Sequence, residues 1–181
     1  KRILYLGFIL ALFGCKQSVI QNDWPVYGGN SERMQYSPLD FIDTSNVQNL
    51  EVAWVYHTGD SARGTQMQTN PLIVDTVLSG VSPKLKLFAV EARSGKEIWT
   101  FDPAHILDNS NPTANIHGMN VCRGVAYYSD GKGKSRIFYT VGSFLYSIDA
   151  LNGVPDPKFG EGGKISLHEG FDVERDIKHL R

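Results

Sequence analysis

The 181-residue sequence has few cysteines and no excess of charge of either sign. With only 2 Cys, neither a disulfide framework nor a structural zinc site can be assembled from cysteine alone. The 18 Lys and Arg residues nearly balance 19 Asp and Glu residues, and a formal net charge of -1 argues against nucleic-acid binding and against an acidic tail. A content of 41% hydrophobic residues, with 18 Gly and 8 Pro, is typical of a soluble domain and excludes a disordered or collagen-like chain.

The sequence also lacks helical periodicity that persists for three turns, and it lacks an apolar stretch long enough to span a membrane stably. The longest apolar stretch covers residues 3–14, which as a helix would rise only about 18 Å against a hydrocarbon core about 30 Å thick. Residues 44–50 begin at a capping residue and predict a single helical turn at most.

Residues 1–15 have the order of an export signal, in which a basic pair is followed by the apolar stretch and then by a cleavage site. Residues 12–15, Leu-Phe-Gly-Cys, resemble the lipobox of bacterial lipoproteins, although Phe13 is bulkier than the residue usual there. The resemblance implies cleavage before Cys15 and acylation of its thiol. The alternatives are a plain signal peptide, or a buried strand or helix in which Cys15 is a core thiol.

The expected organisation has three parts. Residues 1–14 are a lipoprotein-type signal peptide, residues 15–22 are a lipidated tether, and residues 23–181 are a folded domain. The mature protein is then exported, periplasmic and anchored to a membrane through its lipid, with Cys15 unavailable for a disulfide bond and Cys122 left alone.

From residue 23 onward the apolar stretches are short and are bounded by Gly, Pro, Asn or Asp, which predicts strands and an all-β fold. The expected strands are 51–57, 71–77, 85–91, 97–101, 124–128, 136–141 and 144–149.

Internal repeats narrow this prediction. Trp99 follows Trp54 by 45 residues in a similar local sequence, and residues 87–96 are echoed by 145–154. A period near 45 residues is typical of propeller blades with four strands. Each copy reads as a strand, an acidic residue, a tight Gly turn and a next strand, with the Trp placed to stack between blades. The second copy has Pro157 at the Trp position, so its outer strand is expected to be irregular or displaced.

The length of the folded domain indicates whether the propeller is complete. Residues 23–181 correspond to about three and a half blades, whereas propellers close with about 4 to 8. An open arc of blades would expose unpaired strand edges. Since the first residue is also not Met, we expect an amino-terminal part of a longer ring.

Several motifs occur in a fixed order along residues 23–170. They are Asp23 to Asn30, Gln35 to Leu39, Asn46 to Asp60, Pro71 to Val74, Ala89 to Trp99, Cys122 to Tyr127 and Phe159 to Gly163. In combination they resemble the pyrroloquinoline quinone (PQQ) dependent dehydrogenases, and in particular the membrane-associated glucose dehydrogenase branch.

The resemblance implies an eight-bladed β-propeller with PQQ in a central funnel and Ca²⁺ beside the quinone. It also implies that a base accepts the proton of a sugar or alcohol hydroxyl while hydride passes to PQQ, and that a membrane quinone or cytochrome accepts the electrons. A noncatalytic propeller lipoprotein acting as an outer-membrane assembly scaffold is the alternative.

The resemblance carries four cofactor-binding residues onto this sequence, namely Gln68, Met119, Arg123 and Thr140. The guanidinium of Arg123 suits a carboxylate of PQQ, and Gln68 is expected to donate to a quinone oxygen or a carboxylate. Met119 replaces the His or paired Cys of relatives, and its thioether can pack on an aromatic ring, with His117 as a polar substitute.

No residue of the sequence is assigned as a metal ligand or catalytic base, because the family's ligands and base come from later blades. The chain alone is therefore expected to bind neither PQQ nor Ca²⁺ tightly and to be inactive.

Overall fold

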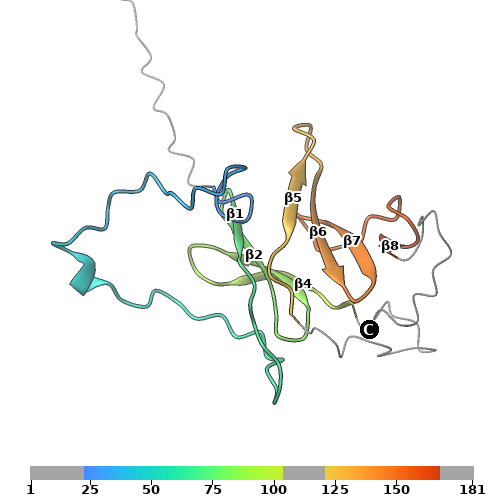
Figure 1. The fold of residues 1–181 in the computed structure, drawn as a ribbon, viewed down its shortest axis with the longest axis horizontal. Coiled ribbons are helices and arrows are strands. Elements are labelled where there is room, and N and C mark those ends of the chain that lie inside the picture. Colours follow the sequence, from blue (N-terminus) through green and yellow to red (C-terminus); the bar gives the residue numbers. More distant parts are fainter. Residues whose placement is uncertain (1–22, 104–120, 168–181) are drawn as a thin grey trace, which may run out of the picture.

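The computed structural model describes residues 23–103 and 121–167, which form two four-stranded antiparallel sheets (Figure 1). The first sheet has the order β1 (Leu72–Val74), β2 (Val77–Val81), β3 (Leu87–Glu91) and β4 (Glu97–Phe101). The second has the order β5 (Ala126–Ser129), β6 (Ser135–Val141), β7 (Phe144–Asp149) and β8 (Lys164–Ser166). Two consecutive four-stranded meanders are the architecture of propeller blades, so the all-β prediction is confirmed.

Helical structure is minor in the described ranges. The helix found there is the short 3-10 turn η1 (Val47–Asn49), which lies inside the predicted turn at 44–50. No helix among the described residues is both long and apolar enough to cross a membrane.

Two strand predictions match their elements at both ends, those for β4 and β7. The prediction of one strand over 71–77 is wrong, because the chain turns after β1 and the same apolar run continues into β2. Asp75 at this turn has a φ of 53°, in the left-handed region, and its N–H donates to Oδ1 of Asp23 at 2.8 Å. Apolar residues on both sides of Asp75 and Thr76 made the segment look like one strand, whereas the turn is held by a residue 52 positions away.

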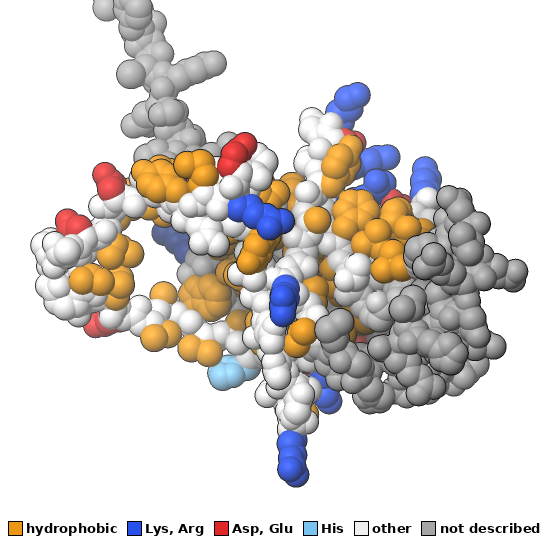
Figure 2. Space-filling model, viewed as in Figure 1, with side chains coloured by type: hydrophobic (Ala, Val, Ile, Leu, Met, Phe, Trp, Pro, Cys, Tyr) orange, Lys and Arg blue, Asp and Glu red, His pale blue; other side chains and the backbone are white. Residues whose placement is uncertain are grey.

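The prediction of a strand over 51–57 is also not met, because this segment pairs with no strand among the described residues. It belongs to an amino-terminal arm that starts with Trp24, whose N–H and C=O bond to the C=O and N–H of Ile73 at 2.6 and 3.0 Å. Beyond residue 35 the arm extends away from the sheets, leaving an open gap (Figures 1 and 2), and it contacts the first blade again at Trp54, whose Nε1 donates to the C=O of Ala92 at 3.1 Å.

The core lies between the two sheets. Along β6 the buried side chains are Ile137, Tyr139 and Val141, the alternation expected for a strand with one face on a core. Phe101 of the first sheet packs edge-on against Tyr139 with ring centroids 6.2 Å apart, and it also contacts Tyr146 at 5.7 Å. These aromatic contacts join the blades face to face.

Tryptophan docking fixes the first sheet against the second. The indole Nε1 of Trp99 in β4 donates to the C=O of Ala150, just after β7, at 3.2 Å. Its ring lies against Gly153, where an added Cβ would stand 2.6 Å from the ring. Gly153 also has a φ of 73°, while Asp149 closes the same turn by accepting the N–H of Leu151 at 2.9 Å. The predicted turn chemistry and stacking between blades are confirmed.

The second blade is irregular at its outer strand, as Pro157 predicted. Pro155 forms an isolated bridge with Ile148, and pairing resumes only at β8, where Ser166 lies opposite Phe144. Residues 156–163 therefore interrupt the strand that would otherwise carry a tryptophan.

The docking geometry predicts that Gly153→Ala is more destabilising than an alanine at another left-handed glycine. An alanine at positive φ costs about 1–2 kcal/mol, and the contact with Trp99 adds about 1–3 kcal/mol of overpacking. Gly131→Ala is the matched control, because its φ is 66° and no atom lies within 4 Å of its added Cβ. Urea unfolding measures both variants, and equal losses in free energy of unfolding would contradict the docking account.

Candidate functional site

The first strands of the two sheets begin side by side. Asn70, just before β1, forms a parallel bridge with Gly124, just before β5. The backbone N–H and the side-chain Nδ2 of Asn70 both donate to the C=O of Arg123 at 2.9 Å. A single residue of the first blade thus fixes the backbone from which the Arg123 side chain projects.

Three of the four predicted cofactor residues meet at this edge. Gln68 lies two residues before Asn70, and Arg123 immediately precedes Gly124. In the antiparallel β5–β6 pairing Ala126 lies opposite Phe138, so Thr140, two residues further along β6, lies at the end of the sheet where β5 begins. The edge is the lower side of Figure 1, where β5 begins and β6 ends.

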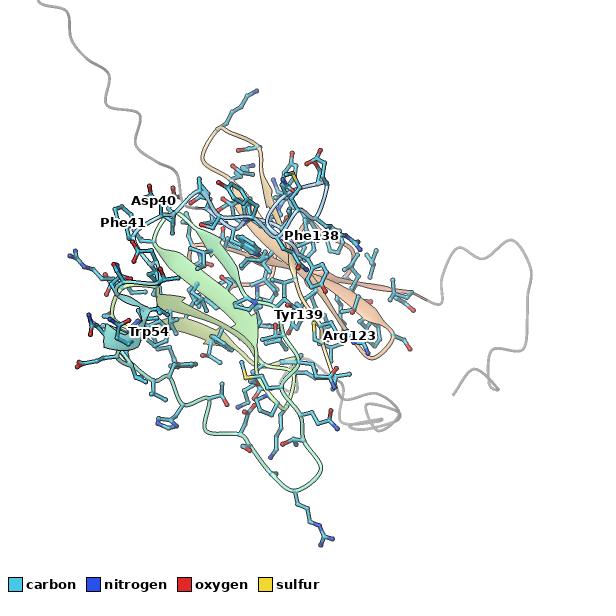
Figure 3. All side chains as sticks on the ribbon, turned by 60° about the vertical axis from the view of Figure 1, so that its left-hand side comes forward. Asp40, Phe41, Trp54, Arg123, Phe138 and Tyr139 are labelled. Atoms are coloured by element: carbon cyan, nitrogen blue, oxygen red, sulfur yellow. The ribbon has the colours of Figure 1, made fainter. Side chains whose placement is uncertain are left out.

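The side chains at the edge are open to a ligand. Gln68, Arg123 and Thr140 are all exposed, and the Arg123 guanidinium makes no ion pair with the described residues. Figure 3 shows Arg123 beside Tyr139, at the end of β6. Nε2 of Gln68 donates to Oε1 of Gln66 at 2.7 Å, a solvent-exposed bond that a ligand can replace. Met119 and its possible substitute His117 lie outside the described residues.

Beneath the edge lie groups that stay neutral. Cys122 is a half-buried free thiol whose Sγ donates to the C=O of Gly124 at 3.0 Å, and burial raises its pKa. Tyr139 is buried, and burial raises the pKa of its hydroxyl, with Tyr146 adding to the shift. Near neutral pH the Cys122 thiol and the Tyr139 hydroxyl are therefore both uncharged.

A buried carboxylate holds the β2–β3 loop at the same edge. Asp60 is only 8% exposed, and it accepts hydrogen bonds from Oγ1 of Thr58 at 2.8 Å, Oγ of Ser82 at 2.5 Å and the N–H of Lys84 at 3.2 Å. Sequence reasoning singled out neither Asp60 nor Asn70. The position of Asn70 directly before Pro71, at the start of an expected strand, is a weak sequence signal for its role.

Among the residues that the structure describes, the edge carries a surplus of positive charge. Arg123 is joined there by Lys84 and Lys86 of the β2–β3 loop, and Arg63 lies in the loop between Asp60 and Gln68. The carboxylate of Asp60 is buried and hydrogen-bonded, and that of Asp102 pairs with Nζ of Lys86 at 2.8 Å. Such an edge favours an anionic ligand.

The residues of the described ranges do not form a metal site. No group of three or more His, Cys, Asp or Glu side chains in 23–103 and 121–167 is placed to hold an ion.

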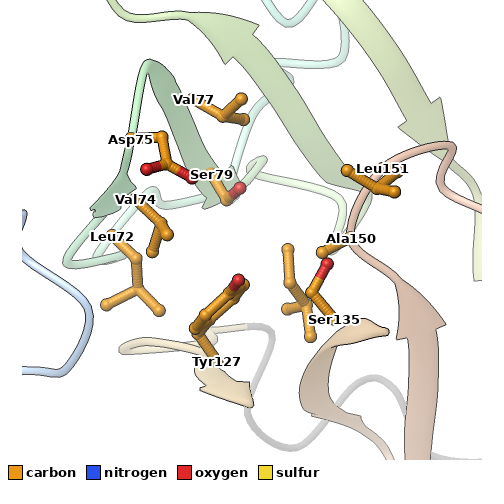
Figure 4. A pocket seen from close by; sticks show the side chains of 10 residues that line it. Leu72, Val74, Asp75, Val77, Ser79, Tyr127, Ser135, Ala150 and Leu151 are labelled. Carbon is orange, nitrogen blue, oxygen red and sulfur yellow. The ribbon is translucent and has the colours of Figure 1, made fainter. Parts of the chain in front are cut away.

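An apolar cavity of about 60 Å³ lies between the blades (Figure 4). It is lined by side chains that include Leu72, Val77 and Ile137, and also by Asp75 in the β1–β2 turn and Leu151 after β7. Those two turns are at the end of the sheets opposite Arg123. Ligand pockets usually measure about 300–1,000 Å³, so this cavity is a packing defect rather than a cofactor site.

Comparison with known proteins identifies the family. Residues 24–180 match the family model described as PQQ, "Glucose/ethanol/alcohol dehydrogenase, beta-propeller domain". The chain belongs to this family. The predicted family and the partial β-propeller fold are therefore confirmed.

Curated relatives are much longer than the chain. It is 36% identical over 170 residues to quinoprotein glucose dehydrogenase from Escherichia coli (strain K12), a match that covers 84% of this chain and 20% of the relative. It is 32% identical over 166 residues to the glycerol dehydrogenase large subunit from Gluconobacter oxydans (strain 621H), covering 85% and 22%. The chain spans about a fifth of the length of these relatives.

A solved structure of the family has the same fold. The quinohemoprotein alcohol dehydrogenase from Comamonas testosteroni superposes with a TM-score of 0.62 at 29% identity, over 82% of this chain and 20% of that one. The two sheets are thus part of a larger propeller architecture in the relative.

The environment of Cys122 predicts that its thiol reacts slowly with alkylating agents. Because burial raises its pKa, the thiolate fraction at pH 8 is smaller than that of an ordinary cysteine with a pKa of about 8.5. Alkylation by iodoacetamide, followed by mass spectrometry of the Cys122 peptide, should have a pH midpoint above that value. The denatured protein is the control. A midpoint at or below the denatured value would contradict the described burial.

Proposed function

We propose that the chain forms part of a PQQ-dependent dehydrogenase that oxidises a sugar or an alcohol. One observation carries the proposal beyond family membership: Gln68, Arg123 and Thr140, far apart in sequence, project from one cationic edge. An anionic cofactor with carboxylate groups suits such an edge. The same observation favours a dehydrogenase over an assembly scaffold, which has no need of convergent exposed polar groups.

The three side chains have distinct roles in this proposal. The planar guanidinium of Arg123 binds a cofactor carboxylate through two parallel hydrogen bonds. Gln68 donates its amide to a quinone oxygen or a carboxylate after leaving Gln66, and the Thr140 hydroxyl adds a further donor at the end of β6. Asn70 keeps the Arg123 backbone in place from the neighbouring blade. When bound, PQQ supplies the acceptor for the hydride removed from the substrate carbon.

Calcium is proposed only for the whole protein. Its ligands and the catalytic base are proposed to come from later blades, as the family resemblance implies. Met119 is proposed to pack on the cofactor ring, with His117 as a polar substitute.

The substrate class is also a proposal. The relatives are named for glucose, glycerol and alcohols, which share a hydroxyl-bearing carbon that can lose hydride. A glucose-like sugar is the first choice, because the sequence motifs match that branch, and a short alcohol is the second. A membrane quinone or a cytochrome is proposed as the electron acceptor.

Residues 1–22 lie outside the described residues, and for them we propose export and lipid anchoring at Cys15. The proposal predicts that metabolically supplied palmitate labels the protein and that Cys15→Ser abolishes the label, because the acylated thiol is gone. Cys122→Ser is the matched control and should leave the label unchanged. Labelling that survives Cys15→Ser would contradict the anchor.

The cofactor edge predicts weaker PQQ binding by Arg123→Gln. Loss of a charge-assisted hydrogen-bond pair of about 1.5–3 kcal/mol should raise the Kd of the full-length protein about 10- to 150-fold. Arg93→Gln removes the same charge from the β3–β4 turn at the opposite end of the sheet and should leave the Kd unchanged. Fluorescence titration of the apoprotein with PQQ measures both. An unchanged Kd for Arg123→Gln would refute the assigned role.

A further inference from the structure

An open pocket of about 310 Å³ lies in the second blade, at the end of the sheets opposite the cofactor edge. It is enclosed by the β5–β6 hairpin and the segment that follows β7. Its lining includes Lys134, Arg136 and Lys158, together with Asp149 and Asp156. Since ligand pockets usually measure about 300–1,000 Å³, this pocket is large enough for a small polar group.

The carboxylates of the pocket are already engaged. Oδ2 of Asp156 lies 2.6 Å from Nη2 of Arg136, and Oδ1 of Asp149 accepts two backbone N–H groups of the turn that follows it, at 2.9 and 3.3 Å. Lys134 and Lys158 are exposed, and neither makes an ion pair with a residue of the described ranges. The charges that the pocket offers to a ligand are therefore two ammonium groups.

The hairpin beside the pocket extends this positive surface. Lys132 is exposed at its tip, and Oδ1 of Asp130 accepts the N–H of Lys132 at 2.7 Å and that of Lys134 at 3.0 Å. The acidic side chain of the hairpin is thus bonded to the backbone of its own turn, while both lysines project from it. Figure 2 shows Lys and Arg side chains at this end of the second blade.

Apolar side chains stand beside the lysines. Leu151 is 70% exposed and Val154 is 54% exposed, both in the turn that follows β7. Tyr128, also exposed, lies opposite Arg136 in the β5–β6 pairing and so shares its face of the sheet. Lysines flanking exposed aliphatic and tyrosine side chains are typical of surfaces that lie at the level of lipid headgroups.

The chain enters the fold at the same end of the molecule. The parallel bridge between Asn70 and Gly124 gives β1 and β5 the same direction, so the β1–β2 turn and the β5–β6 hairpin lie at one end (Figure 1). Asp23 is tied to that turn, because its Oδ1 accepts the N–H of Asp75 at 2.8 Å. Eight residues of extended chain from Cys15 to Asp23 span at most about 28 Å. A lipid on Cys15 therefore keeps this end, rather than the cofactor edge, near a membrane.

We propose that this end of the second blade docks on anionic phospholipid. Lys134 and Lys158 hold a headgroup phosphate in the pocket, which suits ammonium groups because they bind phosphate as point charges. Leu151 and Val154 enter the headgroup layer. Docking in this pose leaves the cofactor edge facing away from the lipid, where a dissolved substrate can reach it. The proposal rests on the anchoring proposed at Cys15 for this orientation, and it is tested on protein without that lipid.

Vesicle co-sedimentation of the full-length Cys15→Ser protein, which cannot be acylated at that position, tests the docking. Vesicles of phosphatidylcholine with about 30% phosphatidylglycerol should bind at least about tenfold more tightly than phosphatidylcholine alone, because anionic lipid attracts lysines near its surface. Added salt should weaken this binding. Equal binding to both vesicles would overturn the proposal.

Inorganic phosphate distinguishes a lipid headgroup from a free anion. At constant ionic strength, millimolar phosphate should leave the binding to anionic vesicles unchanged. If phosphate abolishes it, the pocket takes a free phosphate and the membrane assignment is wrong. Loss of the palmitate label at Cys15 has no bearing on either result, so the anchor and the docking face fail separately.

Matched lysine variants locate the docking face. Lys134→Gln and Lys158→Gln should each weaken binding to the anionic vesicles about fivefold, and together about 30-fold, the changes that correspond to about 1 kcal/mol per lysine. Lys84→Gln is the control, because it removes an exposed lysine from the β2–β3 loop at the opposite end and should leave vesicle binding unchanged. Equal losses for Lys84→Gln and the pocket variants would contradict the proposal.

Discussion

The structure depends above all on one interaction, the packing of a tryptophan indole against a glycine turn of the next blade. It combines a directional bond, Nε1 to a backbone C=O, with a steric condition, because no side chain other than hydrogen fits beneath the ring. Gly153 adopts the left-handed φ that the turn requires, and its lack of a Cβ leaves room for the indole ring. The two sheets also contact each other through Phe101, which packs against both Tyr139 and Tyr146.

The candidate site is a consequence of the stacking rather than of any local motif. Once the blades are fixed, the starts of β1 and β5 lie side by side, and Asn70 holds the backbone of Arg123. Gln68 and Thr140 then join Arg123 at one cationic edge, while the apolar cavity between the blades is too small for a cofactor. The position of the polar groups therefore follows from blade packing.

Local patterns predicted what depends on local structure. The bounds of β4 and β7, the Gly turns and the displaced outer strand at Pro157 were predictable because each depends on a few adjacent residues. The turn at Asp75 was not, since its anchor lies 52 residues away, and the link from Asn70 to Arg123 spans 53 residues. Gln68, Arg123 and Thr140 came from family resemblance, and only the folded pairing brings them together.

The proposed function depends above all on an anionic cofactor binding at the edge where β1 and β5 begin. A structure of the full-length protein with PQQ bound tests this directly. We expect a cofactor carboxylate within hydrogen-bonding distance, about 2.7–2.9 Å, of the Arg123 guanidinium. We also expect the hydrogen bond from Gln68 to Gln66 to be broken. Cofactor bound elsewhere, with Arg123 left in solvent and the Gln66–Gln68 bond intact, would contradict it.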